Sequence, residues 1–416
     1  MALDSKDLFT QQLEAEAMVN WLSSYGQTSN GGVSRLLYSD AWVHAQQALK
    51  DKMNEFGLIT HFDRVGNLFG RVDGTESQSS TILTGSHIDS VIDGGKYDGV
   101  YGIIASLLAV KKLLAQYGPP KKSIEVVSLC EEEGSRFPLT FWGSGNITGR
   151  FSMDDALDIK DSNGIGLLEA MKAAGFATNN GESPVRNDIE CFIELHVEQG
   201  ITLERSAKSI GIVSHIVGQR RFNIHILGES NHAGTTPMYY RKDAMLAASH
   251  LITYIHAKAL KTDPQLVATI GKLTAQPNVP NVIAGDVLFT LDVRHFDEDI
   301  LDQFCQDMID YFNEYAKKSD VEIEINEWMS VKPVEMDPLL TKQFERITKE
   351  KQFSFLPIVS GAGHDAQVFG TFCPTALLFV PSEKGISHSP QEFTHKEDLE
   401  KGISILTELL YQLAYE

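Results

Sequence analysis

The feature that most constrains this chain is a set of five polar positions, each placed where a predicted strand gives way to a loop. In chain order they are His87, Asp98, a glutamate within 131–133, His196 and His388. In an open α/β sheet, ligands bind beyond the carboxyl ends of the strands. Imidazoles and carboxylates suit Zn²⁺, Mn²⁺ or Co²⁺. Five such groups, with one carboxylate as a bridge, are enough for two metal ions, and a metal pair activates water for hydrolysis.

The pattern around these positions predicts strands that alternate with helices. Amphipathic helices are expected at 8–22 and 39–56, and an apolar helix at 99–117 that ends at Gly118-Pro119-Pro120. Apolar strands are expected at 81–85, 123–130, 191–196 and 375–380. This alternation indicates an α/β fold with a mixed, largely parallel sheet and helices on both faces. The segment 179–184 has the composition of an exposed loop.

The pattern changes between about residues 213 and 328. It predicts a strand at 221–227, a helix at 242–258, strands at 266–274 and 287–293, a helix at 298–315 and a strand at 321–327. The order βαββαβ is that of a ferredoxin-like α+β domain. Because the later polar segments return to the chemistry of the earlier ones, we expect an insertion. The chain would then comprise a domain of 1–212 and 329–416, and an inserted domain of 213–328. Two domains are also the default for 416 residues.

Two of the polar segments have a purely structural interpretation. Asp98 could cap the helix that follows it, since Asp is a favoured N-cap residue. The three consecutive glutamates at 131–133 could form a solvated acidic run. They follow an apolar strand, however, and would repel one another unless a cation or proton intervenes. Neighbouring carboxylates could also divide two tasks, one as a metal ligand and the next as a general base.

Composition excludes several classes of protein. A formal net charge of −20 argues against binding to nucleic acid, whose phosphates require clustered Lys and Arg. The start of the chain shows no signal-peptide pattern, and the apolar stretch 100–115 contains two lysines and is too short for a membrane span. The four cysteines are far apart in the sequence, as in a reduced cytoplasmic protein. Redox metal chemistry is disfavoured because no Cys cluster, haem motif or dinucleotide fingerprint is present.

The inserted domain carries polar residues of its own. His232 lies in the segment Asn231-His232-Ala233-Gly234-Thr235-Thr236-Pro237-Met238, and Asn281 lies in a Pro-rich turn. Arg294 ends a predicted strand, where it could form a surface salt bridge or hold a substrate carboxylate with two hydrogen bonds. His232 could donate a hydrogen bond to the oxyanion of a tetrahedral intermediate.

Seven segments in order give the chain a family resemblance over essentially its whole length: GSHIDSVIDGGKYDGVYG, EEEGSRF, ELHVEQG, NHAGTTPM, NVIAGDVLFTLDVR, SGAGHDA and GISHSP. Together they resemble the dimetal amidohydrolases of the aminoacylase/carboxypeptidase superfamily, in the hydantoinase/carbamoylase branch. The resemblance implies two divalent metal ions per subunit, Mn or Zn and possibly Co. It also implies a homodimer formed through the inserted domain, which would close over a small ureido substrate.

Carried over by position, the resemblance assigns a role to each polar residue. His87 and His196 would bind one metal, Glu133 and His388 the other, and Asp98 would bridge the two. Glu132 matches the general base and His232 a catalytic residue lent across the dimer. The positions that match substrate contacts are Gln199, Arg221, Asn281 and Arg294, of which Arg294 would hold a carboxylate.

Two substrates remain open within the branch. The stretch 141–147, Phe-Trp-Gly-Ser-Gly-Asn-Ile, resembles the enzymes that act on allantoate, with ureidoglycine, ammonia and CO₂ as products. The alternative substrate is an N-carbamoyl-L-amino acid. A catalytically silent metal-dependent binding protein is a third possibility, disfavoured by the presence of both the base and all five ligands.

Overall fold

The computed structural model of the chain describes residues 5–76, 80–176 and 185–416, with side chains from residue 14 onward. The exposed loop expected at 179–184 lies outside the described residues. The chain divides into two compact units, Met1–Ser214 with Glu335–Glu416, and His215–Val334. The second unit begins two residues later and ends six residues later than the insertion expected at 213–328.

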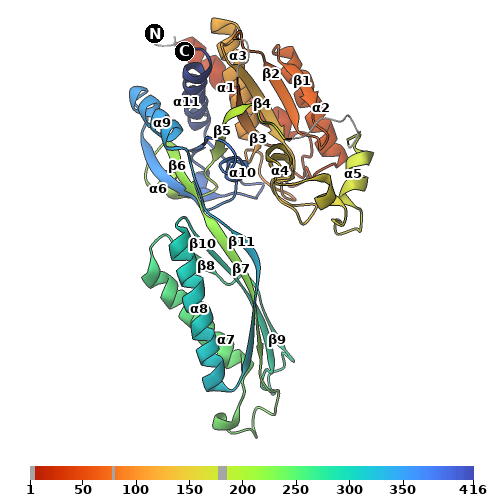
Figure 1. The fold of residues 1–416 in the computed structure, drawn as a ribbon, viewed down its shortest axis with the longest axis vertical. Helices are drawn as coiled ribbons and strands as arrows, with labels where there is room; N and C mark the ends of the chain where they lie inside the picture. Colours follow the sequence, from red (N-terminus) through yellow and green to blue (C-terminus); the bar gives the residue numbers. More distant parts are fainter. Residues whose placement is uncertain (1–4, 77–79, 177–184) are drawn as a thin grey trace. The chain divides into compact units, whose positions relative to one another are not determined.

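A mixed sheet of nine described strands forms the centre of the first unit (Figure 1). Its order is β1-β2-β4-β3-β5-β14-β6-β12, and β13 pairs with β6. The strands are β1 (Ile59–Phe62), β2 (Leu68–Val72), β3 (Thr81–His87), β4 (Ser123–Leu129), β5 (Ile189–Val197), β6 (Ile210–Ile216), β12 (Val334–Glu335), β13 (Phe355–Ser360) and β14 (Thr375–Val380).

The four central strands position the site. Strand β3 pairs in parallel with both β4 and β5, and β14 pairs in parallel with β5. The flanking pairs β1–β2, β2–β4 and β14–β6 are antiparallel. β3, β4 and β14 are buried throughout, as expected for parallel strands covered on both faces. Their carboxyl ends therefore lie side by side at one edge of the sheet.

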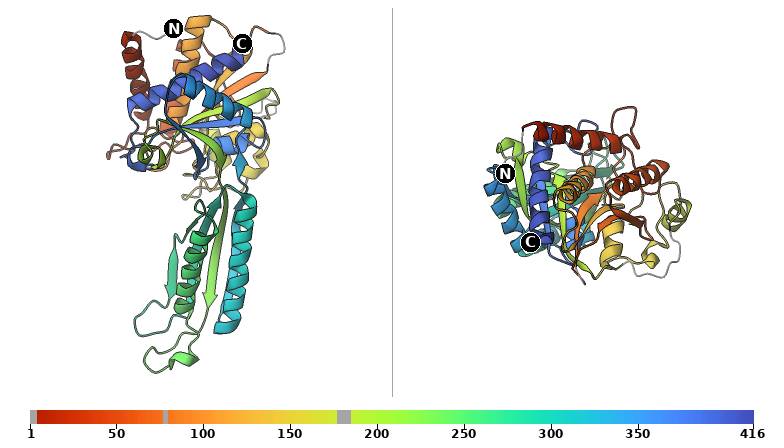
Figure 2. Two further views of the ribbon diagram at one scale, coloured as in Figure 1. Left: turned by 90° about the vertical axis from the view of Figure 1, so that its left-hand side faces the viewer. Right: turned by 90° about the horizontal axis from the view of Figure 1, so that it is seen from above.

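Helices cover both faces of this sheet, as the alternation of elements predicts. They are α1 (Ser5–Ser23), α2 (Asp40–Glu55), α3 (Val100–Tyr117), α4 (Trp142–Thr148), α5 (Leu167–Ala173), α6 (Thr202–Arg205), α9 (Pro338–Glu350), α10 (Asp365–Phe369) and α11 (Lys396–Ala414), with short 3₁₀ turns η1 (Met153–Ala156) and η3 (Glu383–Gly385). α1, α3 and α11 contact one another in one layer (Figure 2).

Side chains of β5 show how the two faces are divided. Phe192 stacks on Phe369 of α10, with ring centroids 4.1 Å apart. Leu195 instead lies against Gly402 of α11. Because side chains alternate along a strand, α10 and α11 cover opposite faces. His196 has the parity of Phe192 and therefore points away from α11.

Helix α3 is long and apolar enough to cross a membrane, at 18 residues, so our expectation that this stretch is too short is wrong. However, 67% of the residues of this helix are buried inside the structure. It packs on β3, β4, β5, α1 and α11, which is the environment of a core helix. The apolar composition of α3 is therefore explained by its burial in the core of the first unit.

The second unit has a five-stranded sheet in the order β11-β7-β10-β8, with β9 also paired to β10. Its elements are β7 (Gly218–Leu227), η2 (Met238–Tyr240), α7 (Ala244–Thr262), β8 (Val267–Thr269), β9 (Leu273–Gln276), β10 (Asp286–His295), α8 (Glu298–Ser319) and β11 (Glu322–Val331). The single strand expected at 266–274 is two short strands, both antiparallel to β10. Ile270, Gly271 and Lys272 lie between the two strands, and the apolar pattern of the sequence does not reveal this break.

One face of this second sheet is covered by α7 and α8. Alternate residues of β7 and β10 are buried against these helices in a core of their own, which includes Phe222, Phe289 and Phe304. The intervening residues of both strands form a half-exposed polar face. This face carries Arg221 and Arg294.

Candidate metal centre

Asp98 lies at the middle of the candidate site, between imidazoles of three different segments. Its Oδ1 is 3.3 Å from Nε2 of His87 and 3.2 Å from Nε2 of His196. Its Oδ2 is 3.4 Å from Nε2 of His388. The carboxylate therefore offers one oxygen to each side, which is the geometry that a bridging ligand needs.

Glu133 completes the second side. Its Oε1 is 3.4 Å from the same Nε2 of His388 that faces Asp98. The structure thus forms two three-residue groups that could each hold a metal ion, His87–Asp98–His196 and Asp98–Glu133–His388, with Asp98 in common. His87, Asp98 and His196 are buried and the side chain of Glu133 is 8% exposed, whereas that of His388 is 49% exposed. The second group is therefore the one open to solvent.

The parallel strands deliver these side chains directly. His87 is the last residue of β3 and His196 the last but one of β5, while Glu133 and His388 follow β4 and β14. Asp98 comes from the glycine-rich loop between β3 and α3. The alternative role of Asp98 as a helix cap is wrong, because Gly99 is the N-cap of α3 and no side chain caps this helix.

Backbone carbonyls fix the orientation of two of the imidazoles. Nδ1 of His87 lies 3.1 Å from the carbonyl oxygen of Asp89, and Nδ1 of His196 lies 2.9 Å from that of Val197. A carbonyl can only accept, so each Nδ1 carries the hydrogen and donates it. Each Nε2 is therefore the nitrogen that faces Asp98 and that could bind a metal once it has lost its own proton. Nε2 of His196 also lies 3.0 Å from the backbone N–H of Gly99, which donates to it.

The titration of these groups reflects the crowding of charge. Burial opposes the charged form of His87, but the hydrogen bond to Asp98 and the nearby carboxylates outweigh it and raise the His87 pKa. Burial likewise opposes ionisation of Asp98, yet His196, His388 and His87 hold its pKa well below the usual range. Burial and repulsion by Asp98 raise the pKa of Glu133 to about 7. Without a metal, protons supply the positive charge that divalent ions would otherwise supply.

The three consecutive glutamates do not form a solvated run. Glu131 is fully buried, and its Oε1 accepts hydrogen bonds from the backbone N–H groups of Arg136 and Phe137. It therefore closes the loop that follows β4. Burial raises the pKa of Glu132, an effect that neighbouring His87 opposes. Glu132 belongs to neither ligand group, which leaves its carboxylate available as a base.

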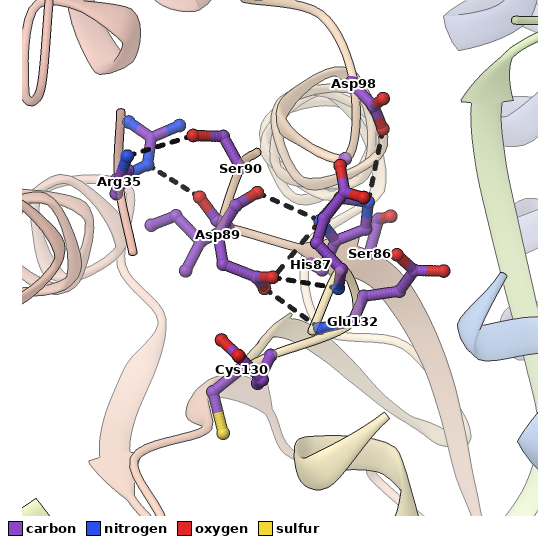
Figure 3. Close-up of polar contacts among 12 residues, drawn as sticks. Arg35, Ser86, His87, Asp89, Ser90, Asp98, Cys130 and Glu132 are labelled. Atoms are coloured by element: carbon purple, nitrogen blue, oxygen red, sulfur yellow. Dashed lines mark hydrogen bonds and ion pairs between the residues drawn. The ribbon is translucent and has the colours of Figure 1, made fainter. Parts of the chain in front are cut away.

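Asp89 holds the turn that carries Glu132 and Glu133, and it lies beside His87 (Figure 3). Its two carboxylate oxygens accept from the backbone N–H groups of Glu132 and Glu133, at 3.2 and 3.1 Å. Its Oδ1 is also 3.8 Å from Nδ1 of His87. The buried guanidinium of Arg35 donates to the carbonyl of Ile88 at 2.6 Å and supports this turn.

Gln199 lies against the Asp98 carboxylate. Its Nε2 donates to Oδ2 of Asp98 at 2.8 Å and lies 3.3 Å from Oγ of Ser387. Its Oε1 is buried and has no hydrogen-bond partner in the described part of the chain. An unpartnered acceptor at this point is suited to an N–H donor of a ligand.

Arg221 and Arg294 meet on the polar face of the second sheet. Both guanidinium groups bind the carboxylate of Asp292, Arg221 at 2.8 Å and Arg294 at 3.0 and 3.1 Å. Nε2 of Gln219 donates to the same carboxylate at 2.7 Å. A substrate carboxylate would therefore share these arginines with Asp292.

His232 and Asn281 also meet, at the other end of the same strands. The backbone N–H of Ala233 donates to the carbonyl of Asn281, and His232 forms a bridge with Val282. In the β7–β10 register, Leu227 opposite Asp286 is eight residues from Gln219 opposite Arg294. At about 3.3 Å per residue, these two register pairs are about 26 Å apart along the sheet, and His232 and Asn281 lie beyond the Leu227–Asp286 pair. One small substrate cannot contact both clusters of a single chain.

Sequence reasoning missed residues that support the candidate ligands, namely Arg35, Asp89 and Glu131. Asp89 and Glu131 carried a signal, because each is a carboxylate within a segment that supplies a ligand. Arg35 carried none, since its partners are main-chain carbonyls of distant residues.

Comparisons with known proteins agree with this geometry. The family model described as peptidase family M20/M25/M40 matches residues 83–412. Among solved structures, an amidase of the hydantoinase/carbamoylase family from Burkholderia multivorans superposes with a TM-score of 0.92 at 33% identity. The alignment covers 97% of this chain and 98% of that one.

Curated relatives are similar over nearly their whole length. The allantoate amidohydrolase of Bacillus subtilis (strain 168) is 50% identical, covering 95% of this chain and 96% of the relative. That of Escherichia coli (strain K12) is 45% identical, covering 96% and 98%. The N-carbamoyl-L-amino acid amidohydrolase of Geobacillus stearothermophilus is 34% identical, covering 94% and 96%.

Proposed function

Because this chain belongs to peptidase family M20/M25/M40, among the hydantoinase/carbamoylase amidases, we propose that it hydrolyses a ureido C–N bond of allantoate. The observation that carries the proposal is the pair of ligand groups that share Asp98. The choice of substrate rests on identities of 50% and 45% with allantoate amidohydrolases, against 34% with a carbamoylase.

The donor set fits two divalent cations. Three imidazoles and two carboxylates converge, and the Asp98 carboxylate presents one oxygen to each side. His87, Asp98 and His196 would hold one ion, and Asp98, Glu133 and His388 the other. Zn²⁺, Mn²⁺ and Co²⁺ all accept this set. When bound, such a pair polarises a carbonyl and lowers the pKa of water.

The remaining residues would carry out the proton transfers and hold the substrate. Glu132 would take a proton from the attacking water and return it to the leaving nitrogen. Attack on one ureido carbonyl would break its bond to the terminal nitrogen and release ammonia. The carbamate left on the other nitrogen would then lose CO₂, which breaks the second C–N bond, so the sum is allantoate plus water to ureidoglycine, ammonia and CO₂. Gln199 would accept from the substrate through its unpartnered Oε1. Arg294, with Arg221, would hold the substrate carboxylate.

We propose a homodimer through the second unit, in which His232 serves the site of the partner subunit. The distance of about 26 Å along the sheet between the His232–Asn281 end and the Arg294 end supports this arrangement. With Arg294 from one chain and His232 from its partner, a single small substrate could contact both. The second unit would also close over the bound substrate.

A cytoplasmic location is consistent with the cysteines. All four are free, and three are buried, which suits a reducing compartment. The acidic balance of the chain fits a small-molecule substrate better than nucleic acid.

The test is ammonia release by purified protein that has been stripped with a chelator and resupplied with Mn²⁺, Zn²⁺ or Co²⁺. We expect turnover of allantoate only after metal is returned. A panel of N-carbamoyl-L-amino acids measured in parallel decides the substrate by the ratio of kcat/KM. A preference for a carbamoyl amino acid would overturn the choice of allantoate. Binding of allantoate without turnover at any metal would overturn hydrolysis itself.

A further inference from the structure

Glu392 is a buried carboxylate that none of the roles above uses. Its exposed fraction is 3%, and it lies four residues after His388 in the loop between β14 and α11. Its Oε2 accepts from the backbone N–H of Tyr97 at 2.8 Å and from that of Asp98 at 3.3 Å. Its partners are 295 and 294 residues earlier in the chain. A carboxylate from the C-terminal part thus holds the backbone of the bridging ligand.

The glycine-rich loop is shaped around this carboxylate. A Cβ atom on Gly95 would lie 1.8 Å from Oε2 of Glu392 and 2.2 Å from its carboxyl carbon. The φ angle of Gly95 is not positive, so the backbone conformation does not require glycine here. The close approach to Glu392 does. Glycine at position 95 therefore lets the loop that presents Asp98 pass directly against the Glu392 carboxylate.

The loop 388–392 reaches Asp98 from two directions. His388 approaches the side chain, with Nε2 at 3.4 Å from Oδ2, while Glu392 binds the backbone. The backbone N–H of Glu392 itself donates to the carbonyl of Ser389, which ties the two ends of the loop together. The position of Asp98 and the position of His388 are thereby fixed by a single short segment.

We infer that Glu392 is a positioning residue for the metal pair, which couples the Asp98 loop to the His388 loop so that the second ion can bind. The inference rests on the proposed two-metal site. The ion held by Asp98, Glu133 and His388 depends on two loops. Glu392 binds the backbone of the Asp98 loop. Ser387 Oγ also donates to Oδ2 of Asp98, and the ring of Tyr97 lies against that of Phe393. The ion held by His87, Asp98 and His196 has two of its three ligands on β3 and β5, which are fixed by the sheet. Loss of Glu392 should therefore weaken the second ion more than the first.

Four substitutions separate this role from a general contribution to folding. Glu392→Ala removes the acceptor, and Glu392→Asp leaves it one methylene short of Tyr97 and Asp98. Glu392→Gln keeps an acceptor oxygen at full length but removes the charge. Gly95→Ala leaves residue 392 intact and places a methyl group where its carboxylate lies. The controls are Glu397→Ala, an exposed carboxylate at the start of α11, and Gly166→Ala, where the nearest atom to the new methyl group is 3.9 Å away.

The measurement is metal per folded chain at a series of free Zn²⁺ or Mn²⁺ concentrations, after gel filtration. We expect two ions in the wild type, in both controls and in Glu392→Gln. We expect one ion at the same free metal in Glu392→Ala, Glu392→Asp and Gly95→Ala, with affinity for the second ion weakened about 10- to 100-fold. Rescue by Gln and failure of Asp identify reach and acceptance, rather than charge, as the requirement.

Two outcomes overturn different statements. If the wild type itself takes up fewer than two ions, the proposed metal pair is wrong. If the wild type takes up two ions and folded Glu392→Ala and Gly95→Ala also do so with unchanged affinity, only the role of Glu392 is wrong. Should Glu392→Ala fail to fold, Gly95→Ala and Glu392→Asp still decide the matter.

Discussion

The division of labour between Glu132 and Glu133 can be tested one residue at a time. Asp89 holds both backbone N–H groups, so their side chains are offered from a fixed turn. Replacing Glu132 by Gln keeps its shape and removes its capacity to accept a proton. We expect kcat to fall by about 10²- to 10⁴-fold, the usual contribution of a general base. Metal per chain should stay at the wild-type value, because Glu132 is in neither ligand group.

Steady-state ammonia release together with metal analysis of the Glu132→Gln variant makes this measurement. Glu133→Gln is the matched comparison, since it should lose metal as well as activity. A Glu132→Gln enzyme that turns over at the wild-type rate would remove Glu132 as the base.

At this scale, the sequence predicts the residues that converge around Asp98 better than it predicts their supports. The converging residues occur in short segments that follow or end the central strands, so local order brings them to one edge of the sheet. Glu392 could not be assigned this way, because its partners are main-chain N–H groups almost 300 residues earlier. Every residue except proline has a backbone N–H group, so the residue type at positions 97 and 98 does not indicate that Glu392 binds there.

At the scale of elements, the contact between α3 and the central strands is close enough to require glycine. A Cβ atom on Gly102 would lie 2.3 Å from the carbonyl oxygen of Leu195 in β5 and 2.7 Å from Cβ of Ser86 in β3. Both strand residues precede a histidine of the site. We expect Gly102→Ala to push the helix from the sheet and lower the free energy of unfolding by about 1–3 kcal/mol.

Urea unfolding at a fixed metal concentration measures this loss. Gly271→Ala is the control, because only Oγ1 of Thr290, at 3.7 Å, lies near the added methyl group. Equal unfolding midpoints for wild type and Gly102→Ala would contradict the close contact between α3 and β5.

Helix α11 carries a titratable group whose effect on stability has a definite sign. Burial raises the pKa of Glu400 to about 7, an effect that Lys112 opposes. Its Oε1 is buried without a hydrogen-bond partner among the described residues. A raised pKa means that the folded state favours the protonated acid. The contribution of Glu400 to stability is therefore present below its unfolded pKa of about 4.3 and is lost as pH rises through about 7.

Glu400→Gln should accordingly leave stability nearly unchanged at acid pH and raise it at pH 8. Because Glu400 is only half-buried, solvent reduces the gain, and we expect about 1–2 kcal/mol. Chemical unfolding at both pH values, with exposed Glu397→Gln as the control, tests this. A gain that is the same at both pH values would show that ionisation of Glu400 is not its cause.

The elements themselves were predictable to different degrees. Period and composition predict β3, β4, β5 and β14, since buried parallel strands are continuous apolar runs. The same rule merges β8 and β9 into one strand, because a break at an exposed edge changes pairing without changing the apolar pattern. The length of α3 likewise does not predict that the helix is buried, because its burial results from packing against β3, β5 and α11 together.

At the scale of the whole molecule, the arrangement of the second unit bears on how many chains form one site. Its two polar clusters lie near opposite ends of β7 and β10, whose paired length between Arg294 and Asp286 is about 26 Å, so His232 and Arg294 of one chain cannot both contact a small substrate. If the proposed dimer is correct, each site combines the metal ligands of one chain with His232 of its partner. Two inactive variants should then complement each other.

The experiment mixes Glu132→Gln and His232→Ala chains after unfolding and refolding, or by coexpression with different tags. In a mixed dimer, one site carries both lesions and the other carries neither. With random pairing, half of the dimers are mixed and half of their sites are intact, so about a quarter of wild-type activity should return. In a parallel experiment, light scattering of the wild type measures how many chains the particle in solution contains. A dimer whose mixed form stays inactive would place His232 in the site of its own chain, whereas a monomer that turns over allantoate would remove the shared site altogether.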